Sequence, residues 1–132
     1  MKADGSIIVI IASDAPLLPV QCKRLARRAT VGLARVGGNG DNGSGDLFLA
    51  FSTGNRGMES TDTIEPSPVR WFPHAAISDL FEAVVDATQE AIINAMCMAM
   101  TTTGKSGRTV YELPLGRLQE IMAKSGRLHS AS

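Results

Sequence analysis

The run Ser6-Ile7-Ile8-Val9-Ile10-Ile11-Ala12 is the feature that most constrains how this chain can fold. Its five central residues, 7–11, are all β-branched, and no polar residue alternates with them. Such a run predicts a β-strand that is buried on both faces, and a strand of this kind needs a layer of structure above and below it. The fold must therefore bring two layers to this strand, from this chain or from another.

The rest of the chain alternates between helical and extended patterns. A glycine-rich loop at 37–45 can bring backbone amides close to a ligand, and the Gly, Ser, Thr and Pro residues of 54–70 predict a long surface excursion. An alanine recurs every four residues from Ala83 to Ala99, which would let a neighbouring backbone approach. The predicted elements are a helix at 17–36 with a proline in its first turn, a strand at 46–53, a long helix at 75–102 with Ser78 as N-cap, a strand at 108–113 and a helix at 115–123.

This order of elements predicts an α/β or α+β fold. Three strands, one of them buried on both faces, are too few for a sheet of ordinary width. The sequence therefore resembles half of a larger fold, whose sheet is completed by another chain or by a further N-terminal segment. We expect residues 1–5 to be a short linker and residues 6–132 to form one domain.

Charge and cysteine content narrow the classes of function. The formal net charge is zero, so there is no electrostatic basis for binding nucleic acid or an anionic membrane, and the run at 7–12 is too short to span a bilayer. We read the basic cluster Lys23, Arg24, Arg27 and Arg28 as a solvated helix face. Cys22 and Cys97 lack metal-ligand spacing, so no metal or other cofactor is expected. With no signal peptide visible, we expect a cytoplasmic protein, or a periplasmic one if a partner chain carries the signal.

The familiar catalytic motifs do not explain this sequence. It contains no G-x-S-x-G, no phosphate-binding GxxxxGK and no H-E-x-x-H. Residues 38–43 satisfy G-x-G-x-x-G, but they follow a predicted helix and precede a predicted strand, the reverse of a dinucleotide site. His74 lies in a connecting segment and His129 in the tail, so a serine–histidine pair is not expected within the chain.

Ser6 is the remaining candidate nucleophile. A glycine before a serine permits a strained peptide, and its hydroxyl can then undergo an N-to-O acyl shift. Hydrolysis of the resulting ester would free Ser6 with an α-amine whose ordinary pKa of about 7.7–8 suits a general base. This chemistry needs no histidine, although a serine at the start of a strand is more often a local hydrogen-bonding group.

Four segments together resemble one known family. They follow one another in its order and spacing: Asp4-Gly5-Ser6-Ile7-Ile8-Val9, Ser13-Asp14-Ala15-Pro16-Leu17-Leu18-Pro19, Lys23-Arg24-Leu25-Ala26-Arg27-Arg28 and Asn42-Gly43-Ser44-Gly45-Asp46. From about residue 4 to about residue 125, the chain is similar to the β-subunit of the DmpA-type L-aminopeptidase/D-esterases, which include the β-peptidyl aminopeptidases.

The resemblance implies both a fold and a mechanism. The fold would be half of a four-layer α/β/β/α sandwich of the N-terminal-nucleophile hydrolase type. A precursor would cleave itself between Gly5 and Ser6, and Ser6 would then attack the N-terminal residue of a peptide, amide or ester. Ser44 would hydrogen-bond near the nucleophile, and Asp46 would orient it or hold its α-ammonium. The resemblance further implies an α-subunit as partner and a multimer of αβ units.

Other readings stay open at this point. The family has a longer segment before the cleavage site that supplies oxyanion donors, so we expect the isolated chain to be inactive or nearly so. The chain could instead be a truncated, non-catalytic remnant that serves as a structural or binding module. An acetyl-transferring enzyme of the same fold group would usually carry Thr at the nucleophile position, and Ser6 argues against it.

Overall fold

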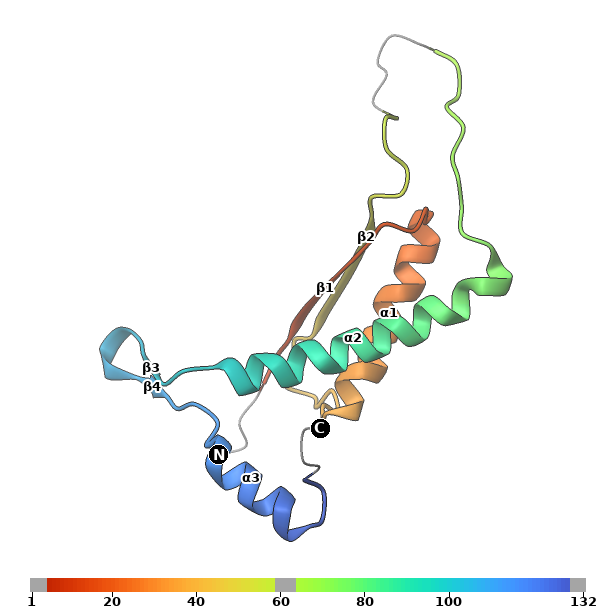
Figure 1. Cartoon of the computed structure of the whole chain (residues 1–132). Helices are drawn as coiled ribbons and strands as arrows, with labels where there is room; N and C mark the ends of the chain where they lie inside the picture. Colours follow the sequence, from red (N-terminus) through yellow and green to blue (C-terminus); the bar gives the residue numbers. More distant parts are fainter. Residues whose placement is uncertain (1–4, 59–63, 129–132) are drawn as a thin grey trace. The chain divides into compact units, whose positions relative to one another are not determined.

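The computed structural model describes residues 5–58 and 64–128. The chain divides into two compact units, Met1–Ala91 and Ile92–Ser132, which are considered separately (Figure 1). The prediction for His129 lies outside the described residues, as do most of the residues expected to form the linker. The position of the boundary between linker and domain stays a prediction.

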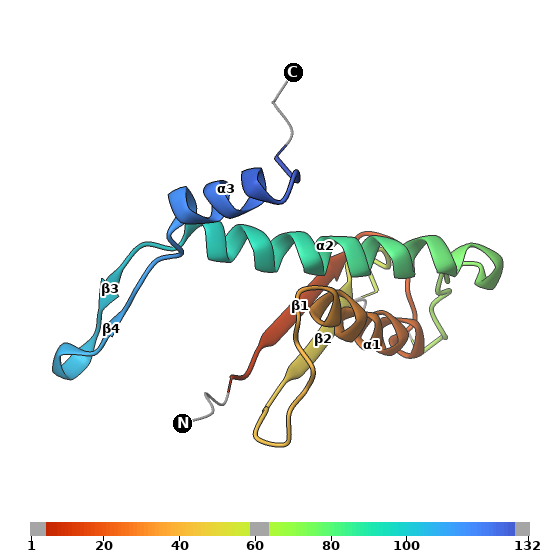
Figure 2. The same ribbon diagram turned by 90° about the horizontal axis from the view of Figure 1, so that it is seen from below.

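The first unit is built on two parallel strands joined by a helix. Strand β1 (Ile8–Ser13) pairs with β2 (Leu47–Ser52), and their register runs from Ile8 opposite Leu47 to Ser13 opposite Ser52. Helix α1 (Pro19–Arg35) connects them, with Pro19 at the start of the helix as predicted. The two strands run side by side in Figure 2. The predicted strand, helix and strand are confirmed in this order.

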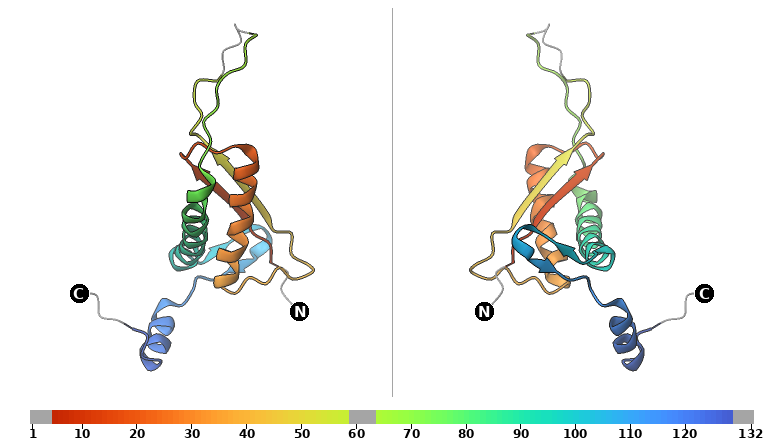
Figure 3. Two further views of the ribbon diagram at one scale, coloured as in Figure 1. Left: turned by 90° about the vertical axis from the view of Figure 1, so that its right-hand side faces the viewer. Right: turned by 90° about the vertical axis from the view of Figure 1, so that its left-hand side faces the viewer.

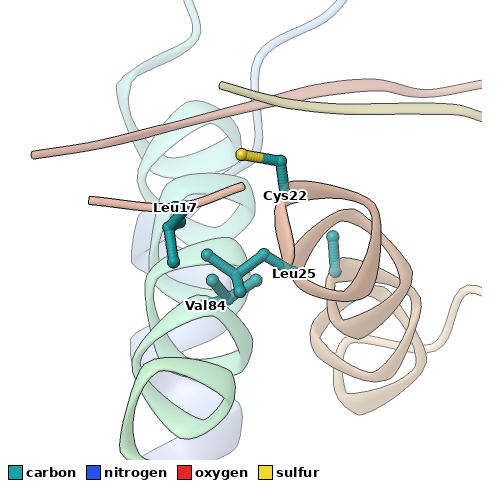
Figure 4. Close-up of a cluster of buried hydrophobic side chains, with 5 residues drawn as sticks. Leu17, Cys22, Leu25 and Val84 are labelled. Atoms are coloured by element: carbon teal, nitrogen blue, oxygen red, sulfur yellow. The ribbon is translucent and has the colours of Figure 1, made fainter. Parts of the chain in front are cut away.

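Helix α2 (Ile77–Met98) follows a 3-10 turn, η1 (His74–Ala76). Its first half packs with α1 over one face of the sheet. A core of Leu17, Cys22, Leu25, Ala29 and Val84 forms between them, and Figure 4 shows four of these side chains converging. On the sheet side, this core is completed by Val9, Ile11, Phe48 and Ala50.

The opposite face of the sheet carries large apolar side chains that are exposed. Ile8 is 69% exposed and Ile10 62%, while Leu47 and Leu49 on β2 are 62% and 57% exposed. In Figure 3 the helix α1 lies in front of the strands in one view and behind them in the other. The prediction of a first strand buried on both faces is therefore wrong for the described chain, because its helices α1 and α2 pack on the other face.

Helices α1 and α2 approach each other closely at Gly32. A Cβ atom placed there would lie 2.6 Å from the carbonyl oxygen of Val85 and 2.7 Å from Cβ of Thr88. The alanines of the predicted row that lie in α2 are exposed, and the approach of a neighbouring backbone to them stays a prediction. The contact of Gly32 with Thr88 lies on a different side of α2.

Part of the predicted solvated basic face is packed. The guanidinium groups of Arg24 and Arg28 lie 5.0 Å and 4.3 Å from the centre of the Phe81 ring on α2. Lys23 and Arg27 are exposed, as expected. The prediction was wrong for the two arginines, since cation–π stacking on an aromatic ring lets a charged group cover apolar surface while it remains partly hydrated.

A buried amide fastens the start of α1. The side chain of Gln21 is almost fully buried; its Oε1 accepts the backbone N–H of Leu18 over 3.0 Å, and its Nε2 donates to the carbonyl of Phe72 over 2.7 Å. Both ends of the amide are thus satisfied. Through this side chain, the helix start is joined to the segment that leads into α2.

The described parts of 53–73 contain no helix or strand and are largely exposed, which confirms the surface excursion there. In this segment, Asn55 exchanges two hydrogen bonds with the backbone of Arg70, of 2.9 Å and 3.0 Å. Within the described residues, no helix is long and apolar enough to cross a membrane.

The second unit contains the end of α2, a short antiparallel hairpin and a helix. Strand β3 (Thr102–Thr103) pairs with β4 (Thr109–Val110) around the turn η2 (Lys105–Gly107), and α3 (Leu115–Lys124) follows. The strand predicted over 108–113 is limited to two residues, and its partner β3 was not predicted. The α3 prediction is confirmed to within one residue.

Candidate active site

The candidate nucleophile and the acidic residue lie at the same end of the sheet. Ser6 comes two residues before β1, and Asp46 comes immediately before β2. Because the strands are parallel and Ile8 is opposite Leu47, the residues preceding each strand also lie opposite one another. The topology therefore brings together two of the residues that the sequence singled out.

Three hydrogen bonds fix this end of the sheet. The backbone N–H of Gly45 donates to Ser6 Oγ over 2.9 Å, and the backbone N–H of Ile7 donates to Asp46 Oδ1 over 3.1 Å. The N–H of Leu47 donates to the carbonyl of Ile7 over 2.9 Å. The serine hydroxyl and the backbone that carries it are thus both held by the start of β2.

Gly45 approaches Ser6 closely. A Cβ atom on Gly45 would lie 3.3 Å from Ser6 Oγ, which is tighter than most contacts of real side chains. A glycine here allows the backbone amide to reach the hydroxyl directly. This contact was missed by sequence reasoning, although the glycine within Ser44-Gly45-Asp46 was the available signal.

A cleft of about 320 Å³ opens beside Ser6. One wall is the glycine-rich loop after α1, where Gly37 and Gly40 have positive φ angles of 95° and 63°. Ser44 lines the cleft, and its backbone N–H donates to the carbonyl of Asp41 over 2.8 Å. Ser6 is exposed to solvent, so a substrate can reach its hydroxyl.

The cleft has an acidic lining. Asp41 and Asp46 are both among its lining residues, together with Gly5, Ser6 and Ser44. Carboxylates favour a positively charged group nearby, since opposite charges within a few ångströms attract. An ammonium group would thus be more favourable in this cleft than an anion.

His74 is engaged away from this cleft. Its Nδ1 lies 3.1 Å from Arg24 Nη1, and its ring makes an edge contact with Trp71 at 5.7 Å between ring centres. It is not among the residues that line the cleft beside Ser6. Among the described residues, no group of three or more His, Cys, Asp or Glu side chains could hold a metal ion.

Comparison with known proteins gives the family. The model of the family described as Peptidase family S58 matches residues 1–110. The chain belongs to this peptidase family. It is 48% identical over 128 residues to the beta-peptidyl aminopeptidase BapA of Sphingosinicella microcystinivorans, covering 97% of this chain and 32% of that relative.

Solved structures that are similar to this chain include two with TM-scores above 0.8. The PH0078 protein of Pyrococcus horikoshii OT3 has a TM-score of 0.84 and 47% identity, covering 93% of this chain and 34% of that one. The L-aminopeptidase D-Ala-esterase/amidase of Ochrobactrum anthropi has a TM-score of 0.82 and 39% identity over 94% of this chain and 35% of its own. It is described as a prototype for the serine aminopeptidases and a new variant among the Ntn hydrolase fold.

These likenesses confirm the predicted resemblance and the α/β fold class of the N-terminal-nucleophile hydrolases. They also show that this S58 chain spans about a third of the length of the proteins it matches. The roles predicted for Ser6, Ser44 and Asp46 remain predictions, to which the geometry adds the amide of Gly45.

Proposed function

We propose that this chain is the nucleophile-bearing part of a self-processing serine aminopeptidase, with Ser6 as the nucleophile. It would remove N-terminal residues from peptides, amides or esters through an acyl-enzyme, and it would act together with a companion polypeptide. The observation that carries the proposal is the 2.9 Å hydrogen bond from Gly45 to an exposed Ser6 Oγ at the edge of the cleft.

Self-cleavage would come first. Ser6 Oγ attacks the carbonyl carbon of Gly5, and the bond from that carbon to the nitrogen of Ser6 breaks as the nitrogen takes up a proton. The ester that results is hydrolysed by one water, which leaves a carboxylate on Gly5 and a free α-amine on Ser6. The backbone amide that donates to Oγ would stabilise the negative charge that develops on this oxygen when it leaves the ester during hydrolysis.

Turnover would then use the freed amine. The α-amine of Ser6 accepts the hydroxyl proton while Oγ forms a bond to the carbonyl carbon of the substrate, and the leaving amine or alcohol departs with a proton. Water hydrolyses the acyl ester and regenerates the serine. The acidic lining of the cleft suits a substrate whose own N-terminus is an ammonium group.

Asp46 and Ser44 would support the nucleophile without reacting. Asp46 accepts the N–H of Ile7, the residue directly after Ser6, and this contact supports an orienting role for its carboxylate. A second role, holding the α-ammonium of Ser6, would begin only after cleavage. Ser44 lies on the same cleft, where its hydroxyl would hydrogen-bond near the nucleophile.

A companion polypeptide would complete the fold and the site. The open face of the sheet carries Ile8, Ile10, Leu47, Leu49 and Phe51, which are all exposed. A continuous apolar face of this kind is costly to hydrate and is typical of a surface that another layer covers. The companion would correspond to the two thirds of the relatives that this chain does not span, and would also supply the oxyanion donors and the rest of the substrate pocket. We propose αβ units that assemble into multimers, in the cytoplasm.

Reconstitution of the complex between this chain and its companion tests the proposed function. The part of the S. microcystinivorans relative that lies outside the match would be co-expressed with this chain, and intact mass and turnover of amino-acid p-nitroanilides would be measured. We expect loss of the first five residues and turnover that neither polypeptide has alone. Ser6→Ala should abolish both cleavage and turnover, while the complex still forms.

The same experiment separates the alternative. A non-catalytic remnant would bind the companion without losing its first five residues and without turnover. A complex that turns over substrate equally well with Ser6→Ala would refute the role of Ser6. Full turnover by the isolated chain would refute the need for a companion.

A further inference from the structure

The glycine-rich loop after α1 contains two asparagine–glycine pairs. They are Asn39-Gly40 and Asn42-Gly43, with Asp41 between them. In such a pair the backbone nitrogen of the glycine can reach the side-chain carbonyl carbon of the asparagine, because glycine has no Cβ atom to obstruct the approach. Attack at that carbon expels the amide nitrogen as ammonia. An exposed and unrestrained pair is therefore a position where a neutral side chain becomes a carboxylate without an enzyme.

The first pair is unrestrained. Asn39 and Gly40 are both exposed and belong to no helix or strand. Among the residues that the structure describes, none forms a hydrogen bond with the side chain of Asn39 or with the backbone N–H of Gly40. Gly40 has a φ angle of 63°, and a Cβ atom placed on it would meet no atom within 4 Å beyond its chain neighbours. The attacking nitrogen and the amide carbon can thus meet without breaking an existing contact.

The second pair is held by a turn. The backbone N–H of Ser44 donates to the carbonyl of Asp41 over 2.8 Å, and Asn42 and Gly43 are the central residues of the turn that this bond closes. Ring closure between Asn42 and Gly43 needs rotation of the backbone between these two residues. That rotation would open the turn, so reaction at this pair must first break a hydrogen bond.

Asn39 also lies where a new charge would have an effect. It lines the cleft beside Ser6, together with Asp41 and Asp46. A carboxylate in place of its amide would add negative charge to this lining, and negative charge favours a nearby ammonium group. Asn42 is not among the residues that line the cleft. The less restrained pair is therefore also the pair whose conversion changes the cleft.

We propose that Asn39 is a site of spontaneous deamidation, which adds a carboxylate to the cleft beside Ser6. The backbone nitrogen of Gly40 bonds to Cγ of Asn39, the bond from Cγ to Nδ2 breaks, and ammonia leaves with the proton of the Gly40 N–H. One water then opens the succinimide ring. Opening at Cγ gives aspartate, and opening at the backbone carbonyl carbon gives isoaspartate. Either product carries one more carboxylate than the asparagine.

Mass spectrometry of the full chain during incubation near neutral pH tests the site. Trypsin releases residues 36–56, and fragment masses then assign any conversion of an amide to an acid. In the folded chain, Asn39 should convert about tenfold faster than Asn42, because the turn hydrogen bond must break first at Asn42. Asn55, whose side chain exchanges two hydrogen bonds with Arg70, should stay an amide over the same period.

The same chain in urea is the matched control. Without the turn, the two Asn-Gly pairs should convert at similar rates. Equal rates for Asn39 and Asn42 in the folded chain would overturn the inference, and so would a folded chain in which Asn39 does not convert. These results are independent of the proposed function, since they need neither the companion polypeptide nor turnover.

Two variants of Asn39 test the effect of the charge, and this step rests on the proposed function. Asn39→Asp reproduces one product, whereas Asn39→Gln keeps the amide on a longer side chain that closes a ring less readily. In the reconstituted complex at low salt, Asn39→Asp should have a KM for amino-acid p-nitroanilides about two- to fivefold lower than Asn39→Gln, as expected for an exposed pair of opposite charges. High salt should reduce the difference.

Two outcomes separate this effect from the proposed function. Equal KM values for the two variants at low salt would overturn the electrostatic effect of deamidation on the cleft. Absence of turnover in the complex with the unchanged chain would refute the proposed function and would leave the mass measurements on Asn39 as the test of the modification site.

Discussion

Gly45 reaches Ser6 through its backbone alone. Its N–H donates to Ser6 Oγ over 2.9 Å, and a Cβ atom in its place would lie 3.3 Å from the same oxygen. The backbone N–H of Gly45 can reach the Ser6 hydroxyl because Gly45 has no side chain in the way. This contact connects the start of β2 to the candidate nucleophile before β1.

Gly45→Ala should slow both self-cleavage and turnover in the reconstituted complex. The added methyl group displaces Ser6 Oγ by a few tenths of an ångström and loosens its hydrogen bond, and errors of this kind in position cost about 10- to 100-fold in rate. Cleavage would be followed by intact mass and turnover by p-nitroanilide release. Gly116→Ala, where nothing lies within 4 Å of the added methyl group, is the control. Unchanged rates for Gly45→Ala would argue against this contact as part of the site.

Two substitutions of Asp46 separate its possible roles. Asp46→Asn keeps an oxygen that can accept the N–H of Ile7, whereas Asp46→Ala removes the acceptor. If orientation is the main role, Asp46→Ala should lower kcat/KM by about tenfold or more, because a hydrogen bond to a charged group contributes about 1.5–3 kcal/mol, and Asp46→Asn should lower it less. Equal losses in the two variants would show that the negative charge matters, as expected for a group that holds the α-ammonium.

Gly32→Ala should destabilise the first unit. An alanine normally stabilises a helix relative to glycine by about 1 kcal/mol. Here the new methyl group would lie 2.6 Å from a backbone oxygen, so α1 and α2 must separate, and overpacking of this kind costs about 1–3 kcal/mol. The midpoint of urea unfolding should fall for Gly32→Ala and should not fall for Gly116→Ala. A higher midpoint for Gly32→Ala would contradict the close approach of the helices.

Stability should decline at alkaline pH because of Cys22. Burial raises the pKa of this thiol above its ordinary value. Because the unfolded thiol ionises at a lower pH than the folded one, Cys22 favours the unfolded state once the pH exceeds the unfolded pKa of about 8.5. Below this pH both states hold the proton, and the free energy of unfolding does not change with pH. As the pH rises toward the folded-state pKa, the free energy of unfolding falls. Urea midpoints measured from pH 7 to 10 should therefore fall more steeply for the natural chain than for Cys22→Val. Parallel curves would show that Cys22 does not contribute.

Much of the first unit could be predicted from the sequence. The β-branched run and the amphipathic stripe of α1 carry strong periodic signals, and Pro19 marks the start of the helix. Because Ser6 precedes the first strand and Ser44 and Asp46 precede the second, pairing of the two strands is enough to bring these chain segments together. The strand β3 could not be predicted, because its two threonines are too few to show the alternation of apolar and polar residues that is typical of a strand.

The remaining features depend on contacts that a single sequence does not specify. The stacking of Arg24 and Arg28 on Phe81, and the closeness of Gly32 to Thr88, depend on how α1 and α2 cross. The sequence predicts burial for the face of β1 that is exposed, because hydrophobicity indicates that a face is covered without indicating which polypeptide covers it. The donor at Ser6 is a backbone amide, which every residue except proline has, so residue type alone could not single out Gly45.

The hydrogen bonds at Ser6 and Ile7 also determine what a cut between Gly5 and Ser6 would leave behind. Newly made chain ends usually fray, because few contacts hold them. Here Gly45 holds the hydroxyl of Ser6, and both Asp46 and Leu47 hold the backbone of Ile7, and all of these contacts lie on the C-terminal side of the bond. The new N-terminus would therefore already be held in place when the bond is cut. The nucleophile would need no further conformational change between self-cleavage and the first turnover.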